Sequence, residues 1–141
     1  MKFKLQNQYL NGAIQLMQRM PLAGYDSMAR TRFIKVLGEP FQALSDSKKE
    51  LLEEYVRRDE KSNPVIKGNN YQLIPDRIQD YQNAYNKLTG ETAEIDKPTY
   101  TNHLKDVQRI LRNSTLQLAD DDATIYAALC EALEVNFEEE V

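Results

Sequence analysis

The fold of this sequence depends most on residues 33–44, which read Phe33-Ile34-Lys35-Val36-Leu37-Gly38-Glu39-Pro40-Phe41-Gln42-Ala43-Leu44. Apolar side chains recur here three and four residues apart, which is the period of an amphipathic α-helix. Gly38 and Pro40 interrupt the stripe, and proline both lacks an amide proton and crowds the preceding helical turn. We therefore expect helix on both sides of a kink or break near Val36 to Pro40.

The same helical period recurs along most of the chain. It is found in residues 8–20, 51–56, 78–88, 104–111 and 125–133. Ser47 is followed three residues later by Glu50, which is the spacing of a capping box and predicts a new helix start at that point. The sequence therefore predicts a mainly helical protein.

Three short regions favour β-structure instead. Two β-prone runs, residues 65–66 and 71–74, flank Gly68-Asn69-Asn70, and a turn of Gly and Asn between such runs indicates a β-hairpin. Residues 1–5 alternate apolar and basic side chains, as a short edge strand does. We expect residues 92–95 to form a third strand beside the hairpin. The predicted fold is mainly α with a small β-hairpin or short antiparallel sheet (α+β), arranged as a compact helical bundle.

Length and composition limit the class of protein. The chain has 141 residues with one cysteine, and its 18 Lys+Arg and 22 Asp+Glu give a net charge of −4. This length favours a single domain over residues 1–141. One cysteine excludes an internal disulfide framework and a cysteine-rich zinc site. Because no long apolar run and no secretion signal are found, we expect a soluble, intracellular protein with no membrane association.

The charges are distributed unevenly along the chain. Residues 1–38 carry an excess of basic side chains, whereas no basic residue follows Arg112. Residues 135–141 are predicted to form a frayed acidic tail. The asymmetry marks either a partner-binding surface or two chain ends that attract each other within the fold or across a dimer, and the second interpretation is favoured.

The sequence offers little that could carry out catalysis. His103 is the only histidine, and we expect it to be a partly exposed polar neighbour of the core. Cys130 lies in an apolar arc, where burial raises the pKa of a thiol and makes it unreactive. A phosphate-binding glycine loop is absent. We therefore predict a protein that is not an enzyme, with no catalytic residue, no cofactor and no metal site.

Three groups of residues are candidates for interaction. Arg30, Arg32 and Lys35 could contact nucleic acid, although the acidic balance of the whole chain makes this unlike a typical nucleic-acid-binding domain. Tyr81 and Tyr85 could line a groove or a subunit contact, or form the rim of the core. The acidic cluster is Asp120, Asp121 and Asp122. Consecutive helical residues point about 100° apart and cannot chelate one ion together, so this cluster favours a helix N-terminus.

The order of several segments resembles a known family. These segments are Leu5-Gln6-Asn7-Gln8-Tyr9-Leu10, Ala29-Arg30-Thr31-Arg32-Phe33-Ile34-Lys35, Leu51-Leu52-Glu53-Glu54-Tyr55 and the helix 122–133 with its Tyr-Ala-Ala-Leu sequence. Together they resemble a family of short uncharacterised proteins from phages and prophages of low-GC Gram-positive bacteria. The resemblance covers nearly the whole chain and implies a phage accessory or assembly protein in the bacterial host cytoplasm. It implies no activity, so no residue acquires a catalytic role from it.

Three hypotheses follow for function. The first is a non-enzymatic phage protein that acts through protein–protein contacts, in assembly or as an adaptor or chaperone, with a phage protein, a host protein or another copy of itself as partner. The second is a host-takeover or defence-inhibiting protein whose acidic C-terminal region blocks a nucleic-acid-binding site. The third is direct nucleic-acid binding through Arg30, Arg32 and Lys35.

Overall fold

The computed structural model describes residues 1–138. These residues form five α-helices and two antiparallel sheets of two strands each, and 61% of the chain is helical. The predicted mainly α class with a small antiparallel β component is therefore confirmed. The chain divides into two compact units, unit 1 (Met1–Phe41 and Thr92–Val141) and unit 2 (Gln42–Glu91). That the whole chain is a single domain stays a prediction.

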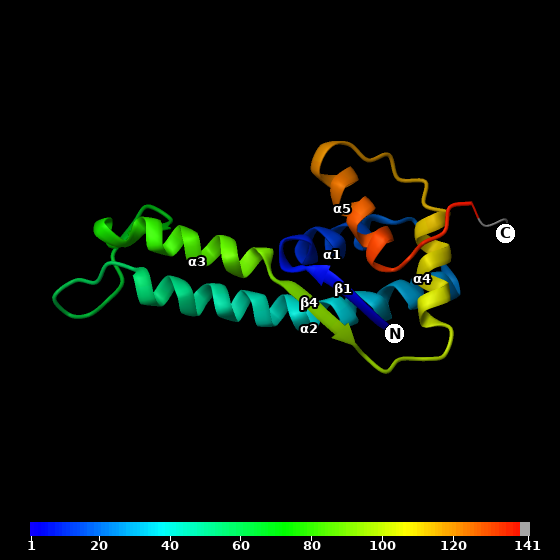
Figure 1. Cartoon of the computed structure of the whole chain (residues 1–141), viewed down its shortest axis with the longest axis horizontal. Helices are drawn as coiled ribbons and strands as arrows, with labels where there is room; N and C mark the ends of the chain where they lie inside the picture. Colours follow the sequence, from blue (N-terminus) through cyan, green and yellow to red (C-terminus); the bar gives the residue numbers. More distant parts are fainter. Residues whose placement is uncertain (139–141) are drawn as a thin grey trace. The chain divides into compact units, whose positions relative to one another are not determined.

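The helices and strands follow one another in a simple order (Figure 1). They are β1 (Lys2–Gln6), α1 (Leu10–Arg19), α2 (Gly24–Tyr55), β2 (Ile66–Lys67), β3 (Asn70–Tyr71), α3 (Ile78–Gly90), β4 (Thr92–Asp96), α4 (His103–Arg112) and α5 (Asp120–Ala132). Single 3₁₀ turns precede α1 and α3. Within the described part of the chain, no helix combines the length and the apolar character needed to cross a membrane.

Helix α2 continues through Gly38 and Pro40. Of the two alternatives predicted near Pro40, the break is therefore wrong and the kink stays a prediction, while the predicted helix start at Ser47 is wrong. A proline inside a helix costs about 3 kcal/mol or more. Leu37 and Leu44, on either side of Pro40, are both buried, and each such burial contributes about 1.5–3 kcal/mol. The packing of the helix on both sides thus offsets the cost of the missing hydrogen bond.

In unit 1, β1 pairs with β4 in antiparallel register, with Phe3 opposite Ile95. Residues 92–96 are thus a strand, as predicted, but the predicted place beside the hairpin is wrong. The alternation of β1 explains the pairing, because Phe3 and Leu5 point to the interior and Ile95 extends the same apolar face. The ring of Phe3 lies 5.8 Å from the ring of Phe33 on α2. The small sheet therefore packs on α2 within unit 1.

Helices α1, α4 and α5 supply most of the remaining core of unit 1. Fully buried side chains on these helices, or directly after α5, are Leu10, Leu16, Met17, Val107, Leu111, Leu129 and Leu133. Gly12 on α1 faces Ile125 on α5 so closely that a Cβ atom at position 12 would lie 2.3 Å from the Cδ1 atom of Ile125. Glycine at this position therefore permits the close approach of the two helices.

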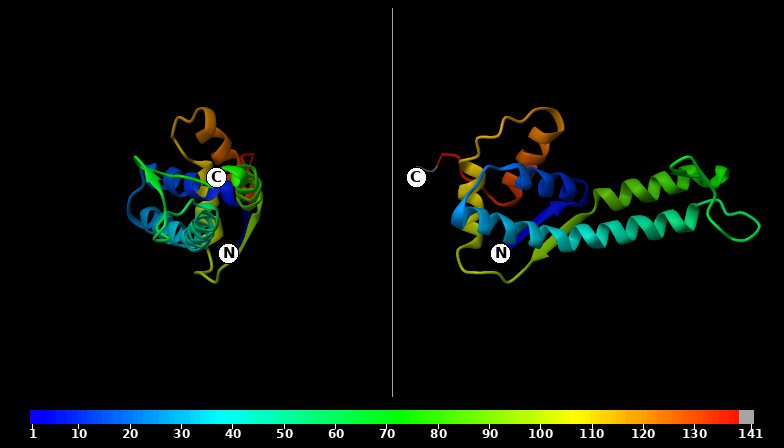
Figure 2. Two further views of the ribbon diagram at one scale, coloured as in Figure 1. Left: turned by 90° about the vertical axis from the view of Figure 1, so that its left-hand side faces the viewer. Right: turned by 180° about the vertical axis from the view of Figure 1, so that it is seen from behind.

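Unit 2 consists of the second half of α2, the β-hairpin and α3. Helix α3 runs alongside the second half of α2 in the opposite direction, as the views in Figures 1 and 2 agree in showing. Strands β2 and β3 pair with Ile66 opposite Tyr71, so the predicted hairpin is confirmed. Gly68 begins the two-residue turn with φ of +65°, a value that glycine adopts without strain.

The segment after α5 is held by one backbone hydrogen bond and one from a side chain. The amide of Val135 donates to the carbonyl of Cys130 (2.9 Å), and Arg112 donates to the carbonyl of Asn136 (2.9 Å). The rest of the predicted acidic tail, residues 139–141, lies outside the described residues.

Candidate functional site

Helix α4 carries two polar residues on its buried face. His103, Asp106, Val107 and Ile110 follow one another at spacings of three, one and three, so the helical period places all four on one side. His103 is fully buried and Asp106 is 5% exposed. A buried carboxylate is costly unless other groups hydrogen-bond to it, so its partners define the site.

Asp106 is the centre of a hydrogen-bonded network in unit 1. Its Oδ2 atom accepts hydrogen bonds from the hydroxyls of Tyr100 (2.8 Å) and Tyr25 (2.9 Å). Its Oδ1 atom accepts a hydrogen bond from Arg109 (3.0 Å), and the same guanidinium also pairs with Asp26 on α2. We call these five residues the Asp106 network. It ties the beginning of α2 to α4 and to the segment before α4.

The network changes the acidity of its members. Burial alone raises the pKa of the Asp106 carboxyl, but the hydrogen bonds from Tyr100, Tyr25 and Arg109 outweigh burial and leave that pKa below its ordinary value. Burial and the hydrogen bond to Asp106 raise the pKa of the Tyr100 hydroxyl. Both tyrosines therefore act here as hydrogen-bond donors to a charged carboxylate.

His103 is more deeply buried than expected from the sequence. The prediction that it would be partly exposed is wrong, because its ring is enclosed by aromatic neighbours. It stacks on Tyr100 with ring centres 4.7 Å apart, and the edge of Phe33 lies 6.2 Å away. Its Nε2 atom contacts the carbonyl of Ala29 at 3.3 Å, whereas Nδ1 is buried with no hydrogen-bond partner among the described residues. Burial lowers the pKa of the imidazole, which favours its neutral form.

The outer side of this part of α2 presents a row of exposed side chains. Tyr25, Met28, Arg32 and Lys35 are spaced by three, four and three residues, so they share one face of the helix. Tyr25 and Met28 are each 54% exposed, and Arg32 and Lys35 are exposed as well. We call these four residues the α2 face. The Arg32 guanidinium lies 4.9 Å above the ring of Tyr100, so the face adjoins the Asp106 network.

Arg30 does not contribute to this face. Its guanidinium donates hydrogen bonds to the carbonyl of Met20 and to the hydroxyl of Ser27, which fastens the segment between α1 and α2. The structure therefore separates the three predicted basic residues. Arg32 and Lys35 share one face, and Arg30 is occupied within the fold. No ion pair of Arg32 or Lys35 is found within residues 1–138.

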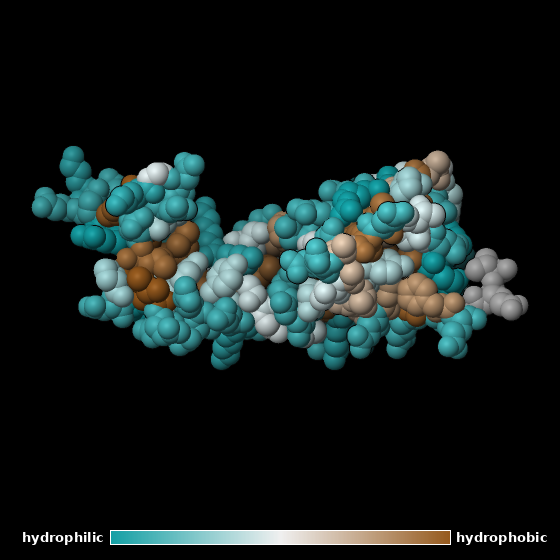
Figure 3. All heavy atoms as spheres, turned by 90° about the horizontal axis from the view of Figure 1, so that it is seen from above, coloured by the Kyte–Doolittle hydropathy of each residue, from teal (hydrophilic) through white to brown (hydrophobic). Residues whose placement is uncertain are grey.

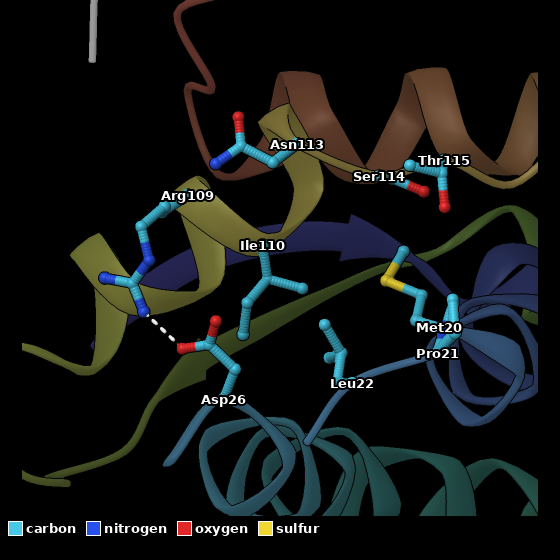
Figure 4. Close-up of a pocket in the computed structure, with 9 residues that line it drawn as sticks. All are labelled: Met20, Pro21, Leu22, Asp26, Arg109, Ile110, Asn113, Ser114 and Thr115. Carbon is cyan, nitrogen blue, oxygen red and sulfur yellow. Dashed lines mark hydrogen bonds and ion pairs between the residues drawn. The ribbon is translucent and has the colours of Figure 1, made fainter. Parts of the chain in front are cut away.

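A small cavity of about 140 Å³ lies next to the ion pair of Asp26 and Arg109 (Figure 4). Met20, Ile110 and Ser114 are among the residues that line it. Sites for small molecules and cofactors usually measure about 300–1,000 Å³, so this cavity is small for such a ligand. Arg109 already pairs with two carboxylates, which leaves it poorly placed to bind an anion there.

Tyr81 and Tyr85 lie together in unit 2, as their spacing on α3 predicts. Their ring centres are 6.1 Å apart, and Tyr55 of α2 contacts Tyr81 at 5.9 Å. Both tyrosines are half-buried and line a hollow of about 430 Å³ with Gln82 and Asn86. This geometry is compatible with a groove and with the rim of a core, so the role of Tyr81 and Tyr85 stays a prediction.

The acidic cluster occupies the first turn of α5, where negative charge favours the positive end of the helix dipole. Asp122 forms an ion pair with Arg19 of α1 at 2.9 Å, whereas Asp120 and Asp121 are exposed. One ion pair thus joins the basic N-terminal region to the acidic C-terminal region within the described part of the chain. The cluster faces solvent with two of its three carboxylates.

Cys130 is buried, as predicted, and burial raises the pKa of its thiol. Among residues 1–138, no three His, Cys, Asp or Glu side chains are grouped so that they could hold a metal ion.

Sequence reasoning did not identify the Asp106 network. A signal was present, because His103 and Asp106 recur with Val107 and Ile110 at helical spacing, and polar residues on an apolar face call for buried partners. The identity of those partners was not accessible, since Tyr25 lies 81 residues before Asp106.

Comparison of the chain with protein-family models, curated proteins and solved structures finds no match. The function must therefore be argued from the geometry of the chain itself.

Proposed function

We propose that this chain is a non-enzymatic accessory protein of a phage or prophage that acts through protein–protein contacts in the host cytoplasm. The α2 face is its binding surface, and the partner is a protein segment that carries acidic and apolar side chains. One observation supports this most strongly: the exposed row of Tyr25, Met28, Arg32 and Lys35 is anchored by a buried hydrogen-bonded network.

The composition of the α2 face suits such a partner. Tyrosine, methionine and arginine are enriched at the centres of protein interfaces, and the flexible thioether of Met28 adapts to different shapes. Arg32 and Lys35 supply positive charge that attracts carboxylates and speeds association. Glu39, which follows Lys35 by one turn, pairs with Lys97, so its negative charge is already countered.

Rigid support distinguishes this face from an ordinary solvated helix surface. The hydroxyl of Tyr25 is fixed by Asp106, so its exposed ring loses less conformational freedom when a partner binds.

The test is capture of partners by the tagged full chain from phage-infected cells. We expect one stoichiometric protein to bind the wild type and to be lost from Arg32→Glu/Lys35→Glu. The matched control is Lys49→Glu/Lys87→Glu, which makes the same change in net charge at two exposed lysines of unit 2. Equal binding by both double variants, or no partner under mild salt, contradicts the proposal.

Direct nucleic-acid binding would use the same residues, Arg32 and Lys35. The salt dependence of affinity and nuclease treatment distinguish it from binding to a protein. The chain is acidic, with a pI of about 5.1, and Arg30 is occupied within the fold. If Arg32 and Lys35 bound nucleic acid, affinity would fall steeply with salt and captured material would be lost after nuclease treatment. Retention of the partner protein after nuclease treatment supports the protein–protein proposal.

A second candidate function rests on the exposed carboxylates of α5. Asp120 and Asp121 are exposed, and the sequence after Arg112 has no basic residue, so they could occupy a basic nucleic-acid-binding site of a host defence protein. Asp120→Asn/Asp121→Asn should then abolish inhibition of a host nuclease. Asparagine tolerates the positive φ of residue 120, so this substitution leaves the helix start intact. Unchanged inhibition would exclude this function.

A further inference from the structure

The exposed apolar side chains of unit 2 do not identify a partner. Figure 3 shows apolar side chains (brown) gathered where the β-hairpin and the beginning of α3 lie. Charges are interspersed with them, because Lys48 lies 5.3 Å above the ring of Tyr85, and Asp80 and Lys87 are exposed on α3. Charge and shape on this surface therefore favour no single occupant. His103 in unit 1 has a more specific chemistry, because it is buried and can take up a proton.

His103 joins the beginning of α4 to α2. Its ring stacks on Tyr100 and packs nearly at right angles against Phe33 of α2, and its Nε2 atom lies 3.3 Å from the carbonyl of Ala29, also on α2. A carbonyl oxygen only accepts hydrogen bonds, so Nε2 carries the proton of the neutral ring. We call this contact the α2–α4 joint. It is complete when the imidazole is neutral.

A second proton on the imidazole has no partner in this joint. Nδ1 has no hydrogen-bond partner within residues 1–138, and the side chain is fully buried. Protonation would make Nδ1 a donor without an acceptor and would place a positive charge in the core. Both changes are unfavourable in a site that water does not reach. The closed joint therefore disfavours the imidazolium, and the second proton is bound readily only where Nδ1 reaches water.

Charged groups of several elements act on the imidazole in addition to its burial. The Arg32 guanidinium on α2 and the amino terminus at Met1, next to β1, oppose a positive charge there, whereas the Asp106 carboxylate favours one. Asp106 is engaged by the other members of its network and forms no hydrogen bond with the imidazole in the described part of the chain. Arg109 and Asp26 pair with each other, so their charges largely cancel. The attraction by Asp106 is thus countered from α2 and from the amino terminus.

We propose that His103 is a pH-sensitive latch, which closes the α2–α4 joint when it is neutral and opens the joint when it takes up a second proton. In the open form the first turn of α4 unwinds and leaves α2, so that Nδ1 reaches water. Tyr25 then loses its hydrogen bond to Asp106, and Arg32 loses its contact with the ring of Tyr100. Two side chains of the α2 face are thus released at mildly acidic pH. The latch would exist even if the α2 face bound no partner.

The opening is local because apolar packing holds the rest of α4. Val107, Ile110 and Leu111 are buried and carry no titratable group. The first turn, in contrast, is closed by the amide of Asp106, which donates to the carbonyl of Asn102 (2.8 Å). Since the open form binds the proton far better than the closed form, the ratio of open to closed chains should rise up to about tenfold for each pH unit below about 6.5.

Hydrogen exchange of single amides, followed by NMR on the full chain from about pH 7.5 to about pH 5, tests the proposal. The protection factor of the Asp106 amide should fall up to about tenfold for each pH unit between about 6.5 and 5.5. Low concentrations of urea should change this protection factor little, because a local opening exposes little surface. The amide of Leu111, in the packed part of α4, is the internal control, and its protection factor should depend on urea much more strongly.

His103→Phe is the matched variant, because phenylalanine keeps an aromatic ring at this position but takes up no proton. His103→Gln provides the same test without a ring, if phenylalanine disturbs the packing. In both variants the protection factor of the Asp106 amide should lose its pH dependence. A pH dependence that either folded variant retains overturns the proposal.

Two further results would overturn the latch. His103 is the only histidine, so its ring signal reports its protonation directly. An imidazole that becomes protonated while the protection factor of the Asp106 amide stays constant would show that the closed joint accepts the proton. Equal urea dependence at Asp106 and Leu111 would show that the joint opens only when unit 1 unfolds as a whole.

Discussion

The carboxylate of Asp106 accepts a hydrogen bond from the hydroxyl of Tyr25, which lies 81 residues earlier in the chain, at 2.9 Å. Asp106 is 5% exposed and Tyr25 is 54% exposed, so the bond connects the interior of unit 1 with the α2 face. The aromatic ring on the surface is therefore positioned by a charge that the solvent barely reaches.

We expect Asp106→Asn to lower the free energy of unfolding by about 1.5–3 kcal/mol, the usual range for hydrogen bonds to a charged group. The amide retains an acceptor but loses the charge that holds Tyr25, Tyr100 and Arg109. Urea denaturation measures the loss. Glu60→Gln is the control, because Glu60 is exposed in the loop after α2 and its replacement should change stability by less than about 0.5 kcal/mol. Equal stabilities of the two variants would contradict a structural role for the network.

The contribution of Asp106 should also depend on pH. Because its pKa in the folded chain lies below the ordinary 3.8, the stabilisation is complete above about pH 4 and is lost as the pH falls through the lower, folded-state value. The difference in unfolding free energy between wild type and Asp106→Asn should therefore shrink below pH 4. Urea denaturation at a series of pH values measures it, and a difference that stays constant to pH 2 would exclude this linkage.

The burial of His103 predicts a second pH dependence of stability, in a higher pH range than that of Asp106. Burial lowers the pKa of the imidazole below 6.5, while the contact with Ala29 and the charge of Asp106 oppose that shift only in part. The unfolded chain then binds a proton that the folded chain excludes, so stability should fall as the pH drops below about 6.5. His103 is the only histidine in the sequence. Both His103→Phe and His103→Gln should remove this slope between pH 6.5 and 5, whatever their absolute stabilities, and a retained slope would contradict the assignment.

The close approach of Gly12 to Ile125 can be tested by a double-mutant cycle. Gly12→Ala gains about 1 kcal/mol of helix propensity, but its Cβ would lie 2.3 Å from the Cδ1 atom of Ile125, and overpacking costs about 1–3 kcal/mol. We expect the single variant to be destabilised. In an Ile125→Ala chain the clash is absent, so the same substitution should stabilise by up to about 1 kcal/mol.

Gly38→Ala is the matched control for this cycle, because Gly38 lies within α2 and a Cβ atom there meets nothing within 4 Å. It should stabilise the chain by about 1 kcal/mol in thermal or urea denaturation. Independent effects of the substitutions at positions 12 and 125 would show that the two helices adjust freely.

Local patterns predicted most of the helices, and tertiary packing decided the remainder. The stripe of residues 33–44 indicated a helix, but the burial of Leu37 and Leu44 carries α2 through Pro40, which propensity alone argued against. Residues 92–95 were predicted as a strand. Their pairing with β1 depends on a long-range match between Phe3 and Ile95, which local sequence does not contain.

The contrast between local pattern and tertiary packing also explains which residues of the candidate site could be predicted. The spacing of Tyr81 and Tyr85 placed them together because both lie on one helix. Arg30 is separated from Arg32 and Lys35 because it donates to the carbonyl of Met20, before α2, and to the hydroxyl of Ser27 on α2. The contact with Met20 depends on the path of the chain between α1 and α2. Asp106 could have been recognised as a polar residue on an apolar face, but Tyr25 as its partner could not.

The reactivity of Cys130 measures how often the core of unit 1 opens to solvent. The thiol is 5% exposed, and burial raises its pKa although Tyr126 hydrogen-bonds to it, so little reactive thiolate is available. We expect a disulfide reagent to modify Cys130 only as fast as the fold opens, and urea should accelerate the reaction. Introducing Thr101→Cys, at an exposed position, supplies a rapidly reacting thiol in the same molecule. Two well-separated phases are expected, with mass spectrometry assigning the slow one to Cys130. If both thiols reacted at the same rate in the absence of urea, α5 would have to move away from the core far more readily than its packing indicates.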